Sequence, residues 1–98
     1  MAISIEKKEG LCKMKIEADM TIFNAAELKN ELISDMGDCS SFEIDLSQVS
    51  EIDTSGVQLL LLIKKEAALQ NKEFKIASHS AATAAVIDLY NMTDYFKN

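Results

Sequence analysis

Residues 44–63 have the sequence IDLSQVSEIDTSGVQLLLLI, and this stretch decides the fold. Ile44 and Leu46 alternate with polar neighbours, a pattern typical of a half-buried strand. An apolar run follows the segment Asp53-Thr54-Ser55-Gly56 and predicts a helix over about residues 56–70. A strand that leads through a polar loop into a helix is the building unit of α/β folds, whose functional loops lie at the carboxyl ends of strands.

The residues before this stretch predict a hairpin and a helix. Ile3 and Ile5 alternate with polar residues, a turn follows at residues 7–10, and a second alternating segment runs from Cys12 to Ala18. For the helix, Asn24 is a candidate cap, supported by Glu27 three residues later, and Gly37 is well placed to end it. Its apolar face has helical spacing: Ala25, Leu28, Leu32 and Met36.

The residues after this stretch predict a strand and a last helix. Phe74 and Ile76 mark the fourth strand, and Ser80 is a candidate cap for the third helix. Two apolar sets are expected to pack: Ala82, Val86 and Leu89 as one helix face, and Met92, Tyr95 and Phe96 folding back onto the core. The order β-β-α-β-α-β-α predicts an α/β domain over residues 1–98, with a small mixed four-stranded sheet and helices mainly on one face.

Charge and composition exclude several classes of function. The chain has 98 residues, enough for one core, and a formal net charge of -6. Binding to nucleic acid or to an anionic membrane needs clustered basic residues, which are missing here. No apolar run is long enough to span a bilayer, and the first residues lack the pattern of a signal peptide. These features favour a cytoplasmic protein that docks onto another protein.

The two cysteines, Cys12 and Cys39, have no metal-ligand or redox-motif spacing. They could form a disulfide, but free buried thiols in a reducing cytosol are the simpler prediction.

No catalytic set of residues stands out. Ser55 lacks the surroundings of a nucleophile elbow, and the single histidine, His79, precedes a helix start and is expected at the surface or near the cap. There is no zinc cluster and no glycine-rich phosphate loop. The sequence therefore predicts no enzyme, metal or cofactor.

The segment 53–56 has two interpretations. Ser55 followed by Gln58 fits a capping box, so the serine could serve only the helix start. Two candidate caps and an aspartate, however, exceed what one helix needs. The apolar helix that follows is also ambiguous: Val57 and Leu61 are either an exposed partner patch or covered by the neighbouring helices.

These residues resemble the STAS domains, the family of anti-sigma factor antagonists. The resemblance covers essentially the whole chain and is strongest from Ile44 to Val57. It extends upstream to Ala18-Asp19-Met20-Thr21 with Asn24-Ala25, and downstream to Ser78-His79-Ser80 with Val86 and Leu89. The sequence departs from the common pattern at Ala18, Asp19 and Thr21, where many members have glycine, glutamate and an acidic residue.

The resemblance implies a phosphorylation switch at Ser55. Unmodified, the protein would bind a partner serine kinase that is often also an anti-sigma factor; phosphorylated, it would let go, and a phosphatase would reset it. The partner-binding residues implied at this loop are Asp19, Thr21, Asp53, Thr54, Gly56, Val57 and Leu61. Two alternatives keep the fold without phosphorylation: a subunit of a chemotaxis-type signalling system, or of a lipid-transporting ABC complex.

Overall fold

The computed structural model describes residues 2–96, so positions 1, 97 and 98 of the expected domain lie outside the described residues. The element order is the predicted β-β-α-β-α-β-α. The strands are β1 (Ile3–Lys8), β2 (Leu11–Ile16), β3 (Ser41–Leu46) and β4 (Glu73–His79). The helices are α1 (Ala25–Met36), α2 (Thr54–Leu69) and α3 (Ala81–Leu89).

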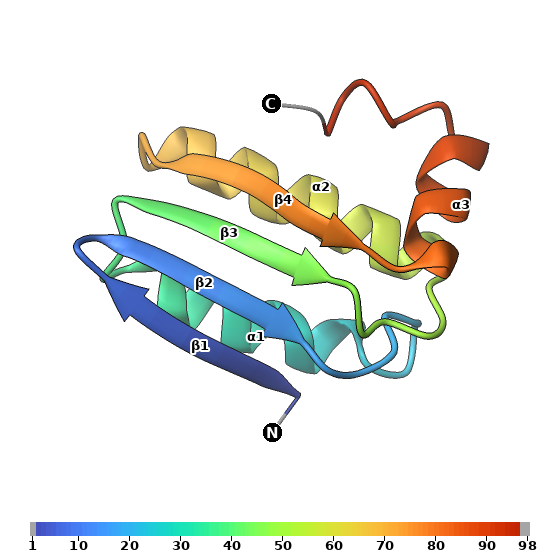
Figure 1. Cartoon of the computed structure of the whole chain (residues 1–98), viewed down its shortest axis with the longest axis horizontal. Coiled ribbons are helices and arrows are strands. Elements are labelled where there is room, and N and C mark those ends of the chain that lie inside the picture. The colour runs from blue at the N-terminus through green and yellow to red at the C-terminus, as the bar shows by residue number, and fades with distance from the viewer. Residues whose placement is uncertain (1, 97–98) are drawn as a thin grey trace.

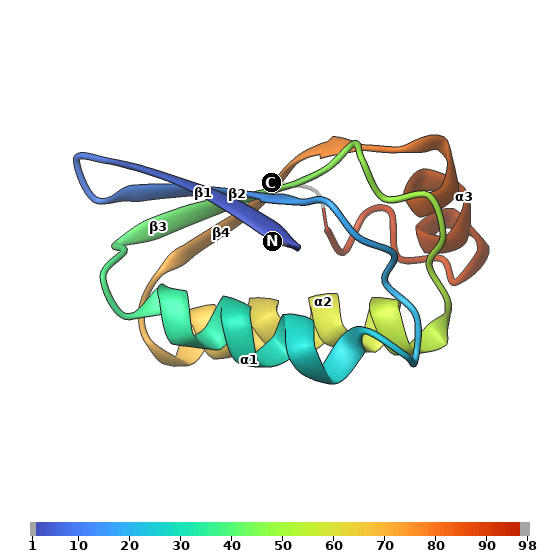
Figure 2. The same cartoon turned by 90° about the horizontal axis from the view of Figure 1, so that it is seen from below.

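The four strands form one mixed sheet in the order β1-β2-β3-β4. β1 runs antiparallel to β2, whereas β2, β3 and β4 are parallel to one another. Helices α1 and α2 cover one face of the sheet, and α3 lies beyond the carboxyl ends of the parallel strands (Figures 1 and 2). The predicted fold class is therefore confirmed, and the end of the sheet next to α3 is where the loops meet.

The core lies between the sheet and the two covering helices. Its central strands supply every second side chain to it, as their alternation predicts: Cys12, Met14 and Ile16 from β2, with Phe42, Ile44 and Leu46 from β3, are buried. From α1 come Leu28, Leu32 and Met36, spaced to share one helical face. The Phe42 and Phe74 rings meet edge to face, 5.7 Å apart, and join β3 to β4.

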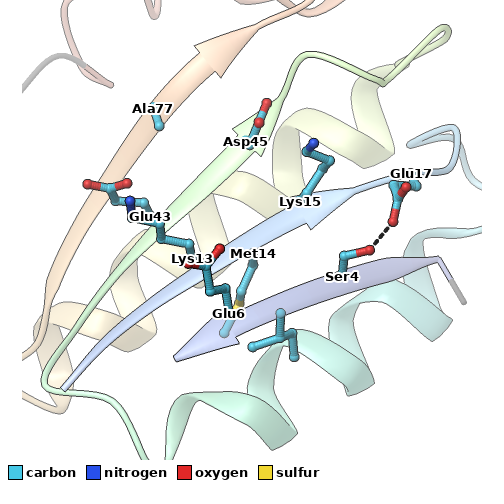
Figure 3. A pocket seen from close by; sticks show the side chains of 10 residues that line it. Ser4, Glu6, Lys13, Met14, Lys15, Glu17, Glu43, Asp45 and Ala77 are labelled. Carbon is cyan, nitrogen blue, oxygen red and sulfur yellow. Dashed lines mark hydrogen bonds between the residues drawn. The ribbon is translucent and has the colours of Figure 1, made fainter. Parts of the chain in front are cut away.

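The other face of the sheet is open and carries charges of both signs. Lys13 lies opposite Glu43, and Lys15 lies opposite Asp45, in the register of β2 with β3. Opposite charges directly across paired strands attract each other, so these side chains stabilise the pairing of β2 with β3. A concavity of about 500 Å³ lies here among these side chains and Glu6 (Figure 3).

Two apolar sets near the C-terminus differ from their predicted packing. In α3 the buried residues are Thr83 and Ile87, while Leu89 is 73% exposed. The cap explains why a different face of α3 is buried. Ser80 caps the helix as expected, but Thr83 completes the capping box and turns inward. Phe96 is buried and Met92 packs against the core, as predicted.

Tyr95, in contrast, does not fold into the core and stays about half exposed. The ammonium of Lys64 lies 4.1 Å from the centre of its ring and also donates a hydrogen bond to its carbonyl. A cation over an aromatic face holds the ring at the surface.

The prediction of free thiols is wrong, because Cys12 and Cys39 form a disulfide with their Cα atoms 5.8 Å apart. Both residues are buried, as expected. Sequence separation was a poor guide here, since β2 and β3 are neighbouring parallel strands that pair Cys12 with Phe42. The Ser40 amide also donates to the Gly10 carbonyl, which brings the chain before β3 back beside the start of β2.

Candidate functional site

The segment 53–56 is bonded to the loop that follows β2. Met20 and Ile52 form an isolated parallel bridge beyond the ends of β2 and β3. The Met20 amide donates to the Glu51 carbonyl over 2.8 Å, and the Asp53 amide donates to the Met20 carbonyl over 3.2 Å. Two loops far apart in the sequence thus form one surface at the carboxyl end of the sheet.

Gly56 is required where these loops meet. A Cβ atom at this position would lie 2.3 Å from the Met20 carbonyl oxygen, and this contact involves backbone that cannot rotate away. The residue is buried and lies in the first turn of α2. Glycine therefore lets the helix start approach the other loop closely.

Asp53, rather than Ser55, caps α2. Its Oδ1 accepts hydrogen bonds from the amides of Ser55 (2.9 Å) and Gly56 (3.3 Å). Its Oδ2 accepts from the Ile22 amide over 3.0 Å, so one carboxylate joins the helix start to the other loop. The expected capping box of Ser55 with Gln58 is wrong because the helix begins two residues earlier than predicted, at Thr54.

Ser55 is partly exposed in the first turn of α2. Within residues 2–96, no group hydrogen-bonds its hydroxyl, and no buried side-chain oxygen is left without a partner. The hydroxyl oxygen is therefore not fully buried and is accessible to solvent at least in part. Its neighbour Thr54 is exposed as well, and the Thr54 and Tyr90 hydroxyls lie 2.6 Å apart, which links α2 to the end of α3.

The apolar residues that follow are mostly covered. Val57 is only 3% exposed, so the expectation that it forms part of an open partner patch is wrong. Leu61 is half-buried and packs against the core. Of the two interpretations of the leucine-rich helix, burial applies at Val57. Helix α2 lies beside α1 in the layer that covers one face of the sheet (Figure 2).

The loop after β2 places the remaining candidate residues. Asp19 Oδ1 accepts from the Glu51 amide over 3.2 Å, and the Thr21 hydroxyl donates to Asn24 Oδ1 over 3.0 Å. This Asn24 oxygen makes no cap bond to α1, so the predicted capping by Asn24 is not made through its side chain. A shallow pocket of about 690 Å³ lies between this loop, residues 50–53 and α3.

Comparison with known proteins places the chain in a family. The family model described as the STAS domain matches residues 2–98. The chain belongs to the STAS domain family. Its fold is that of an anti-sigma factor antagonist from Mycobacterium paratuberculosis, with a TM-score of 0.84 at 19% identity over 96% of this chain and 80% of that one.

Two further solved structures share the STAS fold. A putative anti-sigma factor antagonist from Thermotoga maritima matches with a TM-score of 0.85 at 18% identity, covering 97% of this chain and 83% of that one. The Bacillus cell fate determinant SpoIIAA, in its phosphorylated form, matches with a TM-score of 0.73 at 13% identity over 99% of this chain and 89% of that one. At these identities the likeness establishes the fold.

Sequence reasoning missed three side chains of the candidate site. Ile22 and Phe23 are 67% and 93% exposed beside Asp53, and Tyr90 touches Thr54. The signal for the first two was available: both are large apolar residues between a strand and a helix cap, where no alternation or helical spacing gives them a buried face. Nothing in the sequence pairs Tyr90 with Thr54.

Other chemistry has little support at this site. Throughout the part of the chain that the structure describes, no group of three or more His, Cys, Asp or Glu residues is arranged to hold a metal ion. None of the helices in residues 2–96 has the length and hydropathy needed to cross a bilayer. His79 ends β4 at the surface, where partial burial lowers its pKa.

Proposed function

We propose that this STAS domain is a cytoplasmic, non-enzymatic switch that binds a regulatory protein and is turned off by phosphorylation of Ser55. Unmodified, it would sequester a serine kinase that also acts as an anti-sigma factor, and a phosphatase would restore it. The observation that carries the proposal is the partly exposed Ser55, whose hydroxyl lies unbonded in the first turn of α2 among the described residues. The relatives of known structure that share the fold include anti-sigma factor antagonists.

The folded domain would tolerate a phosphate at Ser55. Amides and the helix dipole at the start of α2 favour an anion. Asp53 is a like-charged neighbour, but both of its oxygens already accept backbone hydrogen bonds that offset its charge. We therefore expect phosphorylation to leave the fold intact.

A bound partner would not tolerate the same phosphate. Phosphoserine carries a charge of about -1.5 to -2 at neutral pH. Covering it with a protein surface costs several kcal/mol unless cations reach it. A cost of about 4 kcal/mol weakens binding roughly a thousandfold, so a local charge is enough to release the partner.

The proposed interface surrounds Ser55. Asp53 and Gly56 fix the backbone of the helix start, and Thr54 and Asp19 lie at the surface beside it. Thr21 and the half-buried Leu61 complete the set of candidate contact residues. Val57 is left out because its side chain is covered.

The test compares Ser55→Ala and Ser55→Asp with the wild type. Each form is used to recover partners from lysate of the native host, and the affinity of the recovered protein is then measured by calorimetry. Binding should persist with Ser55→Ala and fall sharply with Ser55→Asp. The matched control Asn30→Asp adds the same charge to an exposed position of α1 and should bind like wild type. Equal affinity of the two Ser55 variants would end the switch proposal.

A further inference from the structure

Ile22 and Phe23 form an apolar projection next to the proposed switch. Phe23 is 93% exposed, the most exposed of the large hydrophobic residues that the structure describes. Ile22 precedes it and is 67% exposed. Two adjacent large apolar side chains in solvent are a surface feature that protein partners commonly cover.

The turn that carries this projection is held in place. The amides of Asn24 and Ala25 both donate to the Thr21 carbonyl, over 3.0 and 2.9 Å. The Ile22 amide donates to Asp53, which also caps α2. An aromatic side chain on a fixed backbone loses little entropy on binding, which is the property of an interface anchor.

Phe23 has no role inside the fold that would explain it. A large residue directly before a helix cap often packs on the fourth helical residue, and that residue here is Leu28. Leu28 is 1% exposed and lies in the core, while Phe23 points away into solvent. The exposure of Phe23 is thus unexplained by stability of the isolated domain.

The surface beside Phe23 is acidic. Phe23 lines the shallow pocket between the loops and α3 together with Asp19, Glu51 and Asp53, and no Lys or Arg is among the lining residues. Asp53 lines this pocket and also accepts a hydrogen bond from the Ser55 amide, so the acidic surface adjoins the start of α2. Complementarity therefore calls for a partner with cations beside an apolar socket.

We infer that Phe23, with Ile22, anchors the partner protein by inserting into an apolar pocket whose rim carries Lys or Arg side chains facing Asp19 and Glu51. This inference rests on the proposed function for the existence of the partner, and it adds the chemistry of the partner's surface. The cations of the partner pair with Asp19 and Glu51, so they are already engaged when the partner covers Ser55. A phosphate at Ser55 would therefore be buried without a counter-ion.

The first experiment maps what covers Phe23 in the native host. The full chain carries a photoreactive benzoylphenylalanine at position 23 or, as a matched control, at position 69. Leu69 is 70% exposed at the far end of α2, so both positions accept the probe. We expect position 23 alone to cross-link to a different protein, at a peptide with apolar residues flanked by Lys or Arg. Cross-links to a second copy of this chain, equal cross-linking from both positions, or none would overturn the inference.

The second experiment measures affinity with that cross-linked protein after purification. Phe23→Ala should weaken binding at least about thirtyfold, as expected for a hot spot, and Phe23→Leu by less. Leu69→Ala should bind within about twofold of wild type. Added NaCl should weaken binding, and Glu51→Gln should reduce that salt dependence. Wild-type affinity for Phe23→Ala would overturn the anchor.

The two proposals fail separately. If Phe23→Ala loses binding while Ser55→Asp keeps it, the anchor stands and phosphorylation control is wrong. If Ser55→Asp loses binding while Phe23→Ala keeps it, the switch stands and the anchor is wrong. The Phe23 variants should melt like wild type, because the side chain makes almost no contact with the fold.

Discussion

The two ends of the sheet hold the same pair of neighbouring strands together in different ways. At the end where β2 and β3 begin, Cys12 and Cys39 join the chain covalently. At the end where they finish, Met20 is bound to residues 51–53 by hydrogen bonds, and the Asp53 carboxylate adds a third link. The two cysteines at the first end are buried, whereas the second end carries the partly exposed Ser55 and the exposed Phe23.

This difference assigns stability to the disulfide end of the sheet and the proposed signalling to the other end. A disulfide resists opening whatever charge is added at the other end of the molecule. A surface built from hydrogen bonds around one carboxylate keeps polar groups and a hydroxyl accessible, so its charge can be changed without breaking the core. The proposed switch thus lies where the fold depends on polar contacts, and the following experiments break each end in turn.

Removing the disulfide should have the largest effect on stability. The two cysteines are separated by 27 residues, and closing a loop of that length contributes about 3–4 kcal/mol in the chain-entropy model. Urea unfolding of the double variant Cys12→Ser, Cys39→Ser should show a loss of this size. Partner binding should be unchanged, because the bond joins the chain where β2 and β3 begin, whereas Ser55 lies beyond the ends of these strands, in the first turn of α2.

Reductant supplies the control for the disulfide. It should lower the stability of the wild type by a similar amount and leave the double variant unaffected. Disulfides are rare in a reducing cytosol, so alkylation of the protein taken directly from cells should be read by mass to count its free thiols. The stabilising role would be contradicted if the wild type carries the disulfide and its free energy of unfolding does not change when the bond is reduced.

Gly56→Ala should cost about 2–3 kcal/mol, since a methyl group would press on the Met20 carbonyl and force the two loops apart. Partner binding should fall as well, because the same shift moves Ser55. Gly37→Ala is a matched control: nothing lies within 4 Å of its Cβ position, and its φ of -58° suits alanine. That variant should be neutral or slightly more stable in thermal unfolding. Equal melting temperatures for both variants would show that the loops do not meet closely.

Asp53→Ala should cost about 1–2 kcal/mol, because three backbone amides lose their acceptor. Asp53→Asn keeps an acceptor at the cap and should cost less. For comparison, Asp38 forms an exposed ion pair with Lys7, and Asp38→Ala should change the free energy of unfolding by less than about 0.5 kcal/mol. Chemical denaturation of the three variants checks the order, and identical losses for Asp53→Ala and Asp38→Ala would refute the joining role of Asp53.

The sequence predicted those features that follow from regular spacing. One buried face is defined by the strand alternation in β2 and β3, and another by the helical spacing of Leu28, Leu32 and Met36. The fold class and these core residues could therefore be predicted. Family resemblance then located Ser55. Such patterns predict which side of a helix or strand is buried, provided that polar residues occupy the opposite side.

The errors occurred where that contrast was missing or where distant residues meet. The apolar run of α2 has no polar side to mark the surface, so its pattern does not indicate that Val57 is covered. The cap of α2 was ambiguous among three adjacent side chains, and the structure decides for Asp53, whose Oδ1 accepts from the Ser55 and Gly56 amides. Pairing of Cys12 with Cys39 depends on the neighbouring order of β2 and β3, which local sequence does not encode.

The smallest expected effect concerns Asp45, the residue before the last of β3. The hydroxyl and then the amide of Ser47 hydrogen-bond its carboxylate and hold its pKa below the ordinary value of 3.8. A carboxyl whose pKa is lowered by folding adds stability above its unfolded pKa, and that stability is lost as the pH falls through the folded value. Ser47→Ala should therefore move the pKa up toward 3.8, as carboxyl NMR titration would show.

Lys15 gives the comparison for this residue. It lowers the Asp45 pKa through charge alone and by less than Ser47 does, so Lys15→Gln should shift the titration less than Ser47→Ala. Because Asp45 is only partly buried, solvent screens the interaction and the change in stability should be slight. Partner affinity should stay at the wild-type level in both variants, since neither residue contacts Asp53 or the Phe23 turn. A loss of binding in Ser47→Ala would mean that the polar region extends to the end of β3, and that the division between the two ends of the sheet is drawn in the wrong place.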